Sequence, residues 1–436
     1  MKRKFAILLS AMLLMQAVCG CGGAASSGTS SASASTGSIA SKSSEKAVIV
    51  TDEQEFTHEN GITRLAKEIY GDLNVEFFVL SEDTQERETQ ISSLRVEIMA
   101  GGGPDGYLFS SPTSNMTFNG EGHPATLFPD VQRTMQAGAF LPLDDYIKES
   151  EYLRSEDHFA PVFDTGKTDE GQVVLPITHY ASVFLLDKAQ LADPDFTPKT
   201  WDELVNCEDT AVLKVVRNNL YTWCGAGIPR IADYAAEKTI LTEENLTAQF
   251  EDLLAMPASE SFDEETALIQ SGSYAQTDEG MAYYAQNKDT VNALAIPNTE
   301  GGVTAFITSY AAINRNSPKA DEVFRFFELL FSDEAQIDTE TVNDARGTLL
   351  MLGNLNSFLT HKNAYLQPEL LESVQSRVNA VRFYSVMDYT IYDTATTLTW
   401  EENPDCAAAA PLYALLVDGS GSHGCGRGSS ERAALV

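Results

Sequence analysis

The chain has few basic residues for its length. Against 63 Asp and Glu it carries only 29 Lys and Arg among 436 residues, a formal net charge of −34 at pH 7. Such a surface repels phosphate backbones, so we expect no nucleic-acid partner. Solubility alone explains the excess of acid, and a cationic ligand such as a polyamine is the sharper alternative.

Catalytic and metal-binding patterns are also missing. The sequence has no HExxH, GxSxG or P-loop motif, and its six His residues are scattered without an i, i+4 pair. Glycines 101–103 follow a helix pattern and precede a strand pattern, the reverse of the order that a phosphate-binding loop needs. We therefore predict no enzyme, no metal and no cofactor, although so acidic a chain leaves room for a glycosidase pair of carboxylates.

Cysteine is scarce as well. Beyond the first residues, the chain has four, none with zinc-ligand spacing: Cys207, Cys224, Cys406 and Cys425. A disulfide between Cys207 and Cys224 and free buried thiols are both compatible with the sequence.

The N-terminal apolar run is too short for an ordinary transmembrane helix. Residues 5–18 follow a basic KRK triplet, as in a signal peptide. Residues 18–21, VCGC, resemble a bacterial lipobox, with an aliphatic residue three positions before Cys21 and a small residue directly before it. We therefore predict a signal peptide over 1–20 and a lipid anchor at Cys21 on the extracellular face of the cell membrane. Residues 21–44, rich in Gly, Ser and Ala, are predicted to be a flexible tether.

The body of the chain alternates strand and helix patterns. Strand patterns at 47–50, 75–80 and 106–109 enclose helix patterns at 62–70 and 91–98. The continuous apolar run VEFFVL is typical of a strand buried on both faces. This alternation predicts an α/β fold with a mainly parallel sheet.

Two later helices and a tail complete the pattern. Thr200 or Asp202 is expected to cap a short helix, and the stretch 200–290 is rich in helix patterns. Ser317 is expected to cap another helix that carries an apolar stripe. Residues 418–436, rich in Gly and Ser, are predicted to be disordered.

Several segments share the order and character of motifs in one known family. They are RVEIMAGGGPD at 95–105, GAFLPLDDY at 138–146, GQVVLPI at 171–177, TWDEL at 200–204 and AAIN, SPK, ELL and SDEAQ within 311–336. Together they resemble the extracellular solute-binding proteins of bacterial ABC importers, in their maltose-binding-protein-like class. The resemblance covers roughly residues 45–340.

The resemblance implies a two-lobed periplasmic-binding-protein-like fold with the solute in the cleft between the lobes. The lobes would be joined by crossing strands near 176–182, 306–311 and 349–355. Lobe 1 would comprise 45–178 and 307–350, and lobe 2 would comprise 179–306 and 351–417.

The resemblance also implies which positions contact the ligand. They follow the strand after the GPD motif, lie at the first crossing, and follow a later Gly-x-x-Ala strand. The residues at these positions, with one further aromatic candidate, are Phe109, Ser110, Ser111, His179, Tyr180, Asp278, Tyr283, Tyr284 and Trp400. Aromatic faces and a few polar groups suit a sugar or oligosaccharide, whereas Trp201 and Trp223 are expected to be structural.

Two features depart from the family. His179 and Tyr180 occupy the first crossing, where the family often has a carboxylate. The Ala- and Glu-rich helix that usually ends the family starts at Glu401 and dissolves after Ala410. A frameshifted or foreign end is one hypothesis for this difference.

We therefore predict a monomeric, membrane-anchored protein that captures a small solute by lobe closure and delivers it to the permease subunits of an ABC transporter. The alternatives are an anchored polysaccharide-processing hydrolase, a binder of polyamines or other cationic solutes, and an adhesion or scaffold lipoprotein.

The lipobox makes a direct prediction about the anchor. Cys21→Ser should leave the protein without lipid and release it into the medium, because the thiol is the acylated group. Mass spectrometry of the wild type and fractionation of the variant check this. An unmodified Cys21 with cleavage at another position would contradict it.

Overall fold

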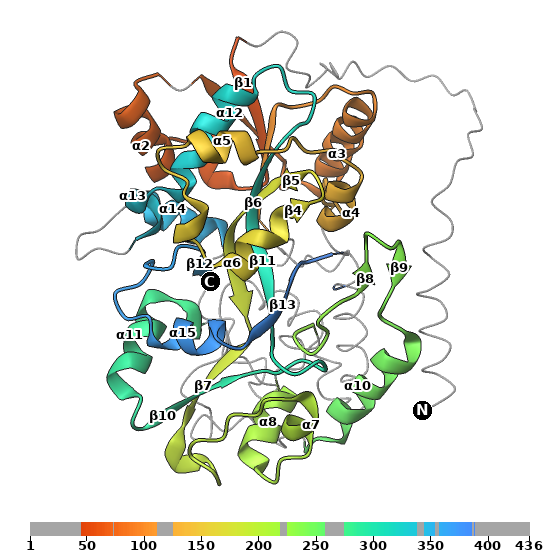
Figure 1. Ribbon diagram of the computed structural model, residues 1–436, viewed down its shortest axis with the longest axis vertical. Coiled ribbons are helices and arrows are strands. Elements are labelled where there is room, and N and C mark those ends of the chain that lie inside the picture. Colours follow the sequence, from red (N-terminus) through yellow and green to blue (C-terminus); the bar gives the residue numbers. More distant parts are fainter. Residues whose placement is uncertain are drawn as a thin grey trace, which may run out of the picture.

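The first strands of the chain form one half of a mixed sheet. β1 (Ala47–Thr51) lies between β2 (Val75–Val79) and β3 (Gly106–Ser110), and both pairings are parallel. The computed structural model, shown in Figure 1, describes residues 45–72, 74–110, 125–218, 225–257, 274–337, 344–353, 357–385 and 388.

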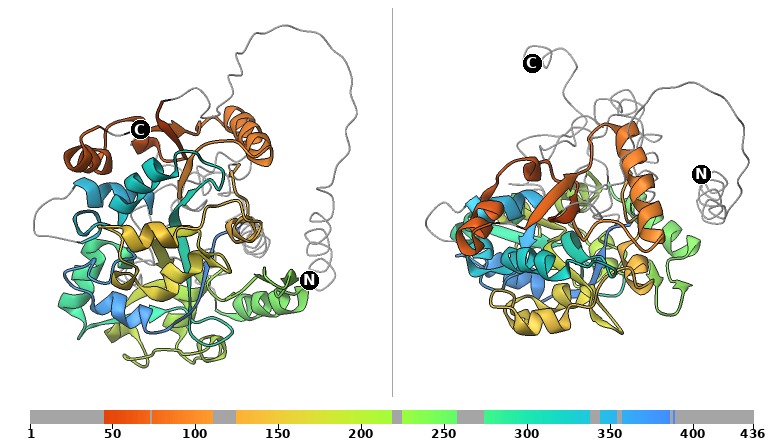
Figure 2. Two further views of the ribbon diagram at one scale, coloured as in Figure 1. Left: turned by 45° about the horizontal axis from the view of Figure 1, so that its top comes forward. Right: turned by 90° about the horizontal axis from the view of Figure 1, so that it is seen from above.

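Helices connect these strands and cover both faces of the sheet. α2 (Gly61–Tyr70) begins at a capping box on Asn60, and α3 (Thr84–Met99) begins where Asp83 accepts a hydrogen bond from a backbone amide. α2 packs on one face and α3 on the other, so the two helices flank β1 (Figure 2). The predicted α/β alternation is confirmed. The prediction of a mainly parallel sheet is wrong, because later strands join this sheet antiparallel and the small sheet of the other lobe is antiparallel.

One strand differs from its prediction. β2 was expected to be buried on both faces, but only Val75 among its five residues is buried. β2 lies at the edge of the sheet, where it has a single neighbour, so its outer side meets solvent.

Two long strands join the lobes. β6 (Val174–Ala181) and β11 (Val303–Ile313) pair antiparallel, and every residue in both is buried. β11 also pairs antiparallel with β3 and parallel with β13 (Val378–Phe383), while β12 (Phe358–Leu359) pairs with β6. In Figure 1, β6 and β11 run from the upper lobe, which holds β1 to β3, into the lower lobe, which holds β7 and β10.

The expected crossing segments fall partly on these strands. Residues 176–181 lie in β6 and 306–311 lie in β11. The third segment, 349–355, coincides with the end of α14 (Asp344–Leu352), and 354–356 lie outside the described residues.

The lower lobe combines a small sheet with several helices. β7 (Val183–Asp187) and β10 (Val291–Ala295) pair antiparallel. Thr200 caps the first helix of this lobe, as predicted. The helices are α7 (Trp201–Val205), α8 (Thr210–Asn218), α10 (Glu243–Ala255) and α11 (Asp278–Asn287).

The remaining elements are short. The helices are α4 (Val131–Gln136), α5 (Asp144–Glu149), α6 (Ala160–Phe163), α12 (Ala320–Phe327), α13 (Asp333–Gln336) and α15 (Glu369–Gln375). The strands form the hairpins β4 (Lys167–Thr168) with β5 (Gly171–Gln172) and β8 (Ala232–Asp233) with β9 (Lys238–Thr239). The 3-10 turns are Gln54–Thr57, Ser155–Asp157, Asp164–Gly166, Lys188–Gln190, Tyr274–Gln276 and Glu328–Phe331.

The start of α12 also corrects a prediction. Ser317 was expected to cap this helix, but its N-cap is Lys319 and the Ser317 hydroxyl donates to Asp105 Oδ1 at 2.7 Å. The apolar stripe itself is confirmed, because Val323 and Phe327 are fully buried.

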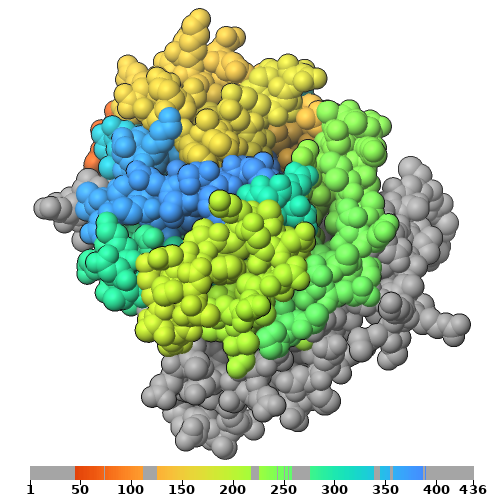
Figure 3. Space-filling view, turned by 60° about the horizontal axis from the view of Figure 1, so that its bottom comes forward, coloured from red at the N-terminus to blue at the C-terminus, as the bar shows by residue number. Residues whose placement is uncertain are grey.

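A bidentate ion pair ties the two lobes together. Arg346 of α14, which packs on α2, donates through both terminal nitrogens to the Asp278 carboxylate at the start of α11, at 2.8 Å each. It also donates to Ala364 O at 3.1 Å. Residues 357–385 (blue in Figure 3) fill the space between the upper lobe (yellow) and the lower lobe (lime) on this face.

This tie predicts an asymmetric mutational effect. The Arg346 side chain is 5% exposed and that of Asp278 is 39% exposed, so Asp278→Asn takes a charged partner from a buried guanidinium, whereas Arg346→Met removes the buried charge itself. Asp278→Asn should lower the free energy of unfolding by about 2–3 kcal/mol, and Arg346→Met by less. Urea unfolding of both variants and the double variant measures this. Equal and negligible effects would contradict it.

Candidate functional site

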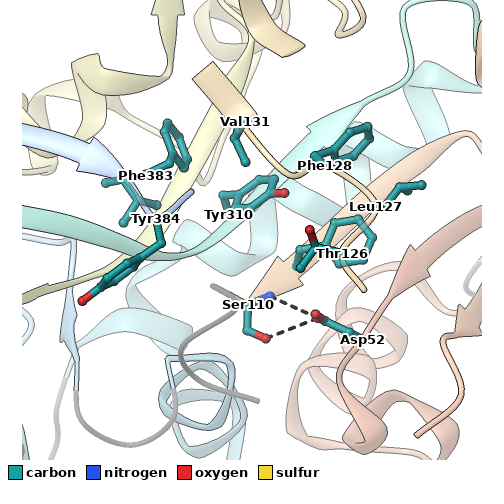
Figure 4. A pocket seen from close by; sticks show the side chains of 11 residues that line it. Asp52, Ser110, Thr126, Leu127, Phe128, Val131, Tyr310, Phe383 and Tyr384 are labelled. Carbon is teal, nitrogen blue, oxygen red and sulfur yellow. Dashed lines mark hydrogen bonds between the residues drawn. The ribbon is translucent and has the colours of Figure 1, made fainter. Parts of the chain in front are cut away.

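A narrow pocket lies where β1 and β3 end. The carboxyl ends of parallel strands in an α/β sheet are where ligands usually bind. Asp52 directly follows β1, and Ser110 ends β3. The lining residues come from both strand ends, from β11 and β13, and from the segment before α4, namely Asp52, Phe109, Ser110, Thr126, Leu127, Phe128, Val131, Ile307, Tyr310, Phe383 and Tyr384 (Figure 4).

Five of the eleven described lining residues are aromatic. Phe109 lies 6.0 Å from Phe128 and 6.2 Å from Tyr310, measured between ring centroids. Tyr310 in turn meets Phe383 edge-on at 5.5 Å. Since these rings come from three distant parts of the chain, the wall exists only in the folded sheet.

One carboxylate provides the charge in this lining. Asp52 Oδ1 accepts hydrogen bonds from the amide and the hydroxyl of Ser110, both at 3.2 Å (Figure 4). Arg87 of α3 lies 3.5 Å from Asp52 Oδ2, and the two side chains are 10% and 8% exposed, respectively. Burial raises the pKa of Asp52 above its usual value, and the Arg87 charge and the Ser110 hydrogen bonds act in the opposite direction.

The pocket is nearly filled by its own side chains. The space left between them holds about 20 Å³, which is room for about one water molecule and not for a sugar ring. A solute can therefore enter only if the lobes or the aromatic wall move.

A second depression lies on the outer surface of the lower lobe. It is lined by Ala192, Asp193, Phe196, Thr197, Pro198, Glu203, Asn206, Cys207, Glu208 and Asp209. Two of its carboxylates already accept backbone hydrogen bonds, Glu203 from Lys199 N and Asp209 from Ala192 N. Cys207 is a free, half-buried thiol, and burial raises its pKa. We therefore regard this depression as a structural feature.

The structure brings two of the expected ligand residues to the pocket. Phe109 and Ser110 line it. Tyr180 is 9% exposed in the core of the lower lobe and accepts a hydrogen bond from the Ser182 hydroxyl at 3.4 Å. His179 is 2% exposed and packs against Phe358 in β12, at 5.6 Å between ring centroids.

Other expected residues lie elsewhere. Asp278, Tyr283 and Tyr284 belong to α11, where Asp278 is bonded to Arg346 and the two tyrosines are partly buried against the core. None of the three lines the pocket at the strand ends. Ser111, Trp400 and Cys21 lie outside the described residues, so their roles stay predictions.

Sequence reasoning missed the other nine lining residues, among them Asp52, Tyr310, Phe383 and Tyr384. Asp52 carried a usable signal, because it is the first acidic residue after the strand pattern at 47–50. Tyr310 lies within the expected second crossing, which marked its position but not the direction of its side chain. Phe383 and Tyr384 had no motif, since their strand pairs with β11 over a long sequence separation.

Comparison with known proteins identifies the class. A model of the bacterial extracellular solute-binding proteins matches residues 59–337, more than half of the chain. The chain therefore belongs to the family of bacterial extracellular solute-binding proteins. Membership confirms the predictions that it is an extracellular binding protein and that it is not an enzyme. None of the curated proteins matches the chain in sequence.

Solved structures support the fold. The sugar-binding protein MalE from Xanthomonas citri is similar with a TM-score of 0.50 and 11% identity, over 85% of this chain and 94% of that one. The cyclic alpha-maltosyl-1,6-maltose binding protein from Arthrobacter globiformis is similar with a TM-score of 0.45 and 13% identity, over 85% of this chain and 98% of that one. The predicted two-lobed α/β fold is thus confirmed by the likeness to MalE.

The described part of the chain contains neither a candidate metal site nor a helix that could span a membrane. Its His, Cys, Asp and Glu side chains form no group of three or more that could hold a metal ion. None of its helices has both the length and the apolar character needed to cross a membrane.

Two buried imidazoles predict that the fold is acid-sensitive. Burial lowers the pKa of His158 and of His179 from 6.5 to about 3. Below pH 6.5 the unfolded chain binds protons that the folded chain does not bind until near pH 3. The stability that depends on neutral imidazoles is therefore complete above this range and is lost as the pH falls through it.

The measurement is the change in unfolding free energy between about pH 7 and pH 4.5. His179→Gln should reduce this change by about 2 kcal/mol relative to the wild type. His58→Gln, at an exposed position, is the matched control and should leave it unaltered. An identical pH dependence in His179→Gln and wild type would contradict the prediction.

Proposed function

We propose that the protein captures a neutral mono- or oligosaccharide between its lobes and delivers it to an ABC transporter. The observation that carries this proposal is the pocket at the ends of β1 and β3, which combines an aromatic wall with one carboxylate already paired to an arginine.

The aromatic wall favours a sugar. A pyranose ring presents an apolar face that stacks on aromatic rings, while its hydroxyls need a few fixed polar partners. Tyr310, Phe383 and Tyr384 supply rings, and Asp52 and Ser110 supply polar groups. MalE, described as a sugar-binding protein, has the same fold at 11% identity, so the fold is compatible with such a ligand.

The charge of the pocket argues against a cationic solute. A polyamine needs carboxylates whose charge is not already compensated. Among the described residues of this lining, Asp52 is the one acidic side chain, and Arg87 lies 3.5 Å from it. The net charge of −34 therefore belongs to the rest of the chain, where it serves solubility.

Lobe movement would open and close the site. The proposed lobes are 45–178 with 307–350, and 179–306 with 351–417, joined through β6 and β11. Hinge closure needs only a few residues to change their backbone angles. Tyr180, at the end of β6 where the lower lobe begins, stays a proposed contact for the closed state, as do His179, Asp278, Tyr283 and Tyr284.

The N-terminal segment supports delivery at a membrane. A lipidated Cys21 followed by the 21–44 tether would hold the folded body about 25 Å from the bilayer, within reach of a permease. We propose that the protein acts there as a monomer on the extracellular face of the cell membrane.

Calorimetry with a panel of maltotriose, mannobiose, chitobiose and spermidine, at low and high salt, tests the proposal. We expect one or more sugars to bind independently of salt, because neutral ligands are not screened. Asp52→Asn should weaken that binding by about 1–3 kcal/mol, because it removes a charged hydrogen-bond acceptor.

Asp193→Asn, in the depression of the lower lobe, is the matched control and should leave sugar affinity unchanged. Salt-sensitive binding of spermidine with no heat from any sugar would overturn the proposal. So would sugar binding that responds to Asp193→Asn and not to Asp52→Asn.

A further inference from the structure

The pocket wall before α4 has little backbone support of its own. Residues 125–129 supply Thr126, Leu127 and Phe128 to the pocket lining. Within the described part of the chain, these five residues make no backbone-to-backbone hydrogen bond. Side chains supply the described hydrogen bonds to this part of the wall.

Two arginines of α3 take that role. Arg87 Nε donates to Ala125 O at 2.8 Å. Arg95, two helical turns further on, donates through Nε to Leu127 O at 3.1 Å and through Nη2 to Thr126 O at 2.5 Å. Three consecutive carbonyls thus accept hydrogen bonds from one face of one helix.

Both arginine side chains are shielded from solvent, which makes these hydrogen bonds important to them. Neither side chain is freely solvated, and burial lowers the pKa of Arg95 from its usual value. A guanidinium carries several donors in a fixed planar fork, so it can satisfy neighbouring carbonyls at once. If the wall moved away, the shielded guanidinium groups would lose these hydrogen bonds. The bonds therefore hold the wall in a fixed position relative to α3.

Arg87 has a second contact that Arg95 lacks. Its Nη2 faces Asp52 Oδ2 at 3.5 Å, so the same side chain touches both the wall and the carboxylate of the pocket. The charged and titratable groups that face Asp52 are Arg87 from α3 and Tyr310 from β11. Arg87 is thus the one cation described next to this carboxylate.

We propose that Arg87 and Arg95 are positioning residues of the binding site. They clamp residues 125–127 against α3, and Arg87 also contacts Asp52, where its charge favours the carboxylate as an acceptor for ligand hydroxyls. The part of this inference that concerns the ligand rests on the proposed function. The clamp itself does not.

The first measurement needs no ligand. Hydrogen–deuterium exchange followed by mass spectrometry reports on the peptide that covers residues 125–137 in the full-length protein, which includes the hydrogen-bonded amides of α4 directly after the wall. Arg95→Gln and Arg87→Gln should each speed its exchange by about tenfold or more, because the wall loses its anchors. Arg133→Gln, an exposed arginine of neighbouring α4, is the control and should exchange like the wild type.

The second measurement separates positioning from a purely structural role. It follows the affinity for maltotriose, mannobiose or chitobiose as the pH falls. Arg87→Gln should move the midpoint at which binding is lost upward by about one pH unit, because the pKa of Asp52 rises without the cation. Arg95→Gln should weaken binding about tenfold and leave the midpoint unchanged.

Arg87→Lys covers the case in which Arg87→Gln does not fold. It keeps the charge and loses the fork, so we expect faster exchange of 125–137 with a midpoint close to that of the wild type. Wild-type exchange in Arg95→Gln, or an unmoved midpoint in Arg87→Gln when sugar binds, would overturn the proposal. If no sugar binds, the proposed function fails, and the exchange measurement alone decides on the clamp.

Discussion

The antiparallel pairing of β6 with β11 is the constraint on which both lobes depend. Every residue of the two strands is buried, so neither can leave the sheet without exposing apolar surface and unpaired backbone groups. The upper half of β11 pairs with β3, and β13 pairs with its lower half. The position of β11 therefore determines where the end of β3 lies relative to the aromatic residues of β11 and β13.

The two faces of this sheet serve different purposes. One face carries a continuous core that includes residues of both lobes, such as Ile49, Val183 and Leu370, and there Arg346 binds Asp278. The opposite face holds Phe109, Tyr310 and Phe383, which meet in the pocket. The attachment between the lobes and the proposed binding pocket are thus separated by the thickness of one sheet. The ion pair and the packing restrain the first face. A movement that opens the pocket must therefore take place on the face that holds the aromatic residues.

The sequence predicted those features that depend on neighbours along the chain. Strands at 47–50 and 106–109 and the helix that Thr200 caps are local patterns, and the structure contains them. The start of α12 was misplaced because the Ser317 hydroxyl binds Asp105, a residue remote in sequence. The burial of β2 was overestimated because an apolar run does not tell an edge strand from a central one.

The site was predicted less completely for the same reason. Phe109 and Ser110 follow a recognisable motif, and both line the pocket. Asp52, Tyr310 and Tyr384 come together only through the register of β1, β3, β11 and β13, which no local pattern encodes. Asp278 was an expected ligand contact, but its carboxylate binds Arg346, which lies 68 positions away in the sequence.

A crystal structure with a bound sugar tests the central claim most directly. We expect a sugar ring between the lobes, stacked on Tyr310, Phe383 or Tyr384, with a hydroxyl donating to Asp52 and the lobes moved apart enough to admit it. A sugar bound in the depression beside Cys207, or one that leaves the side chains around Asp52 unchanged and untouched, would contradict the account.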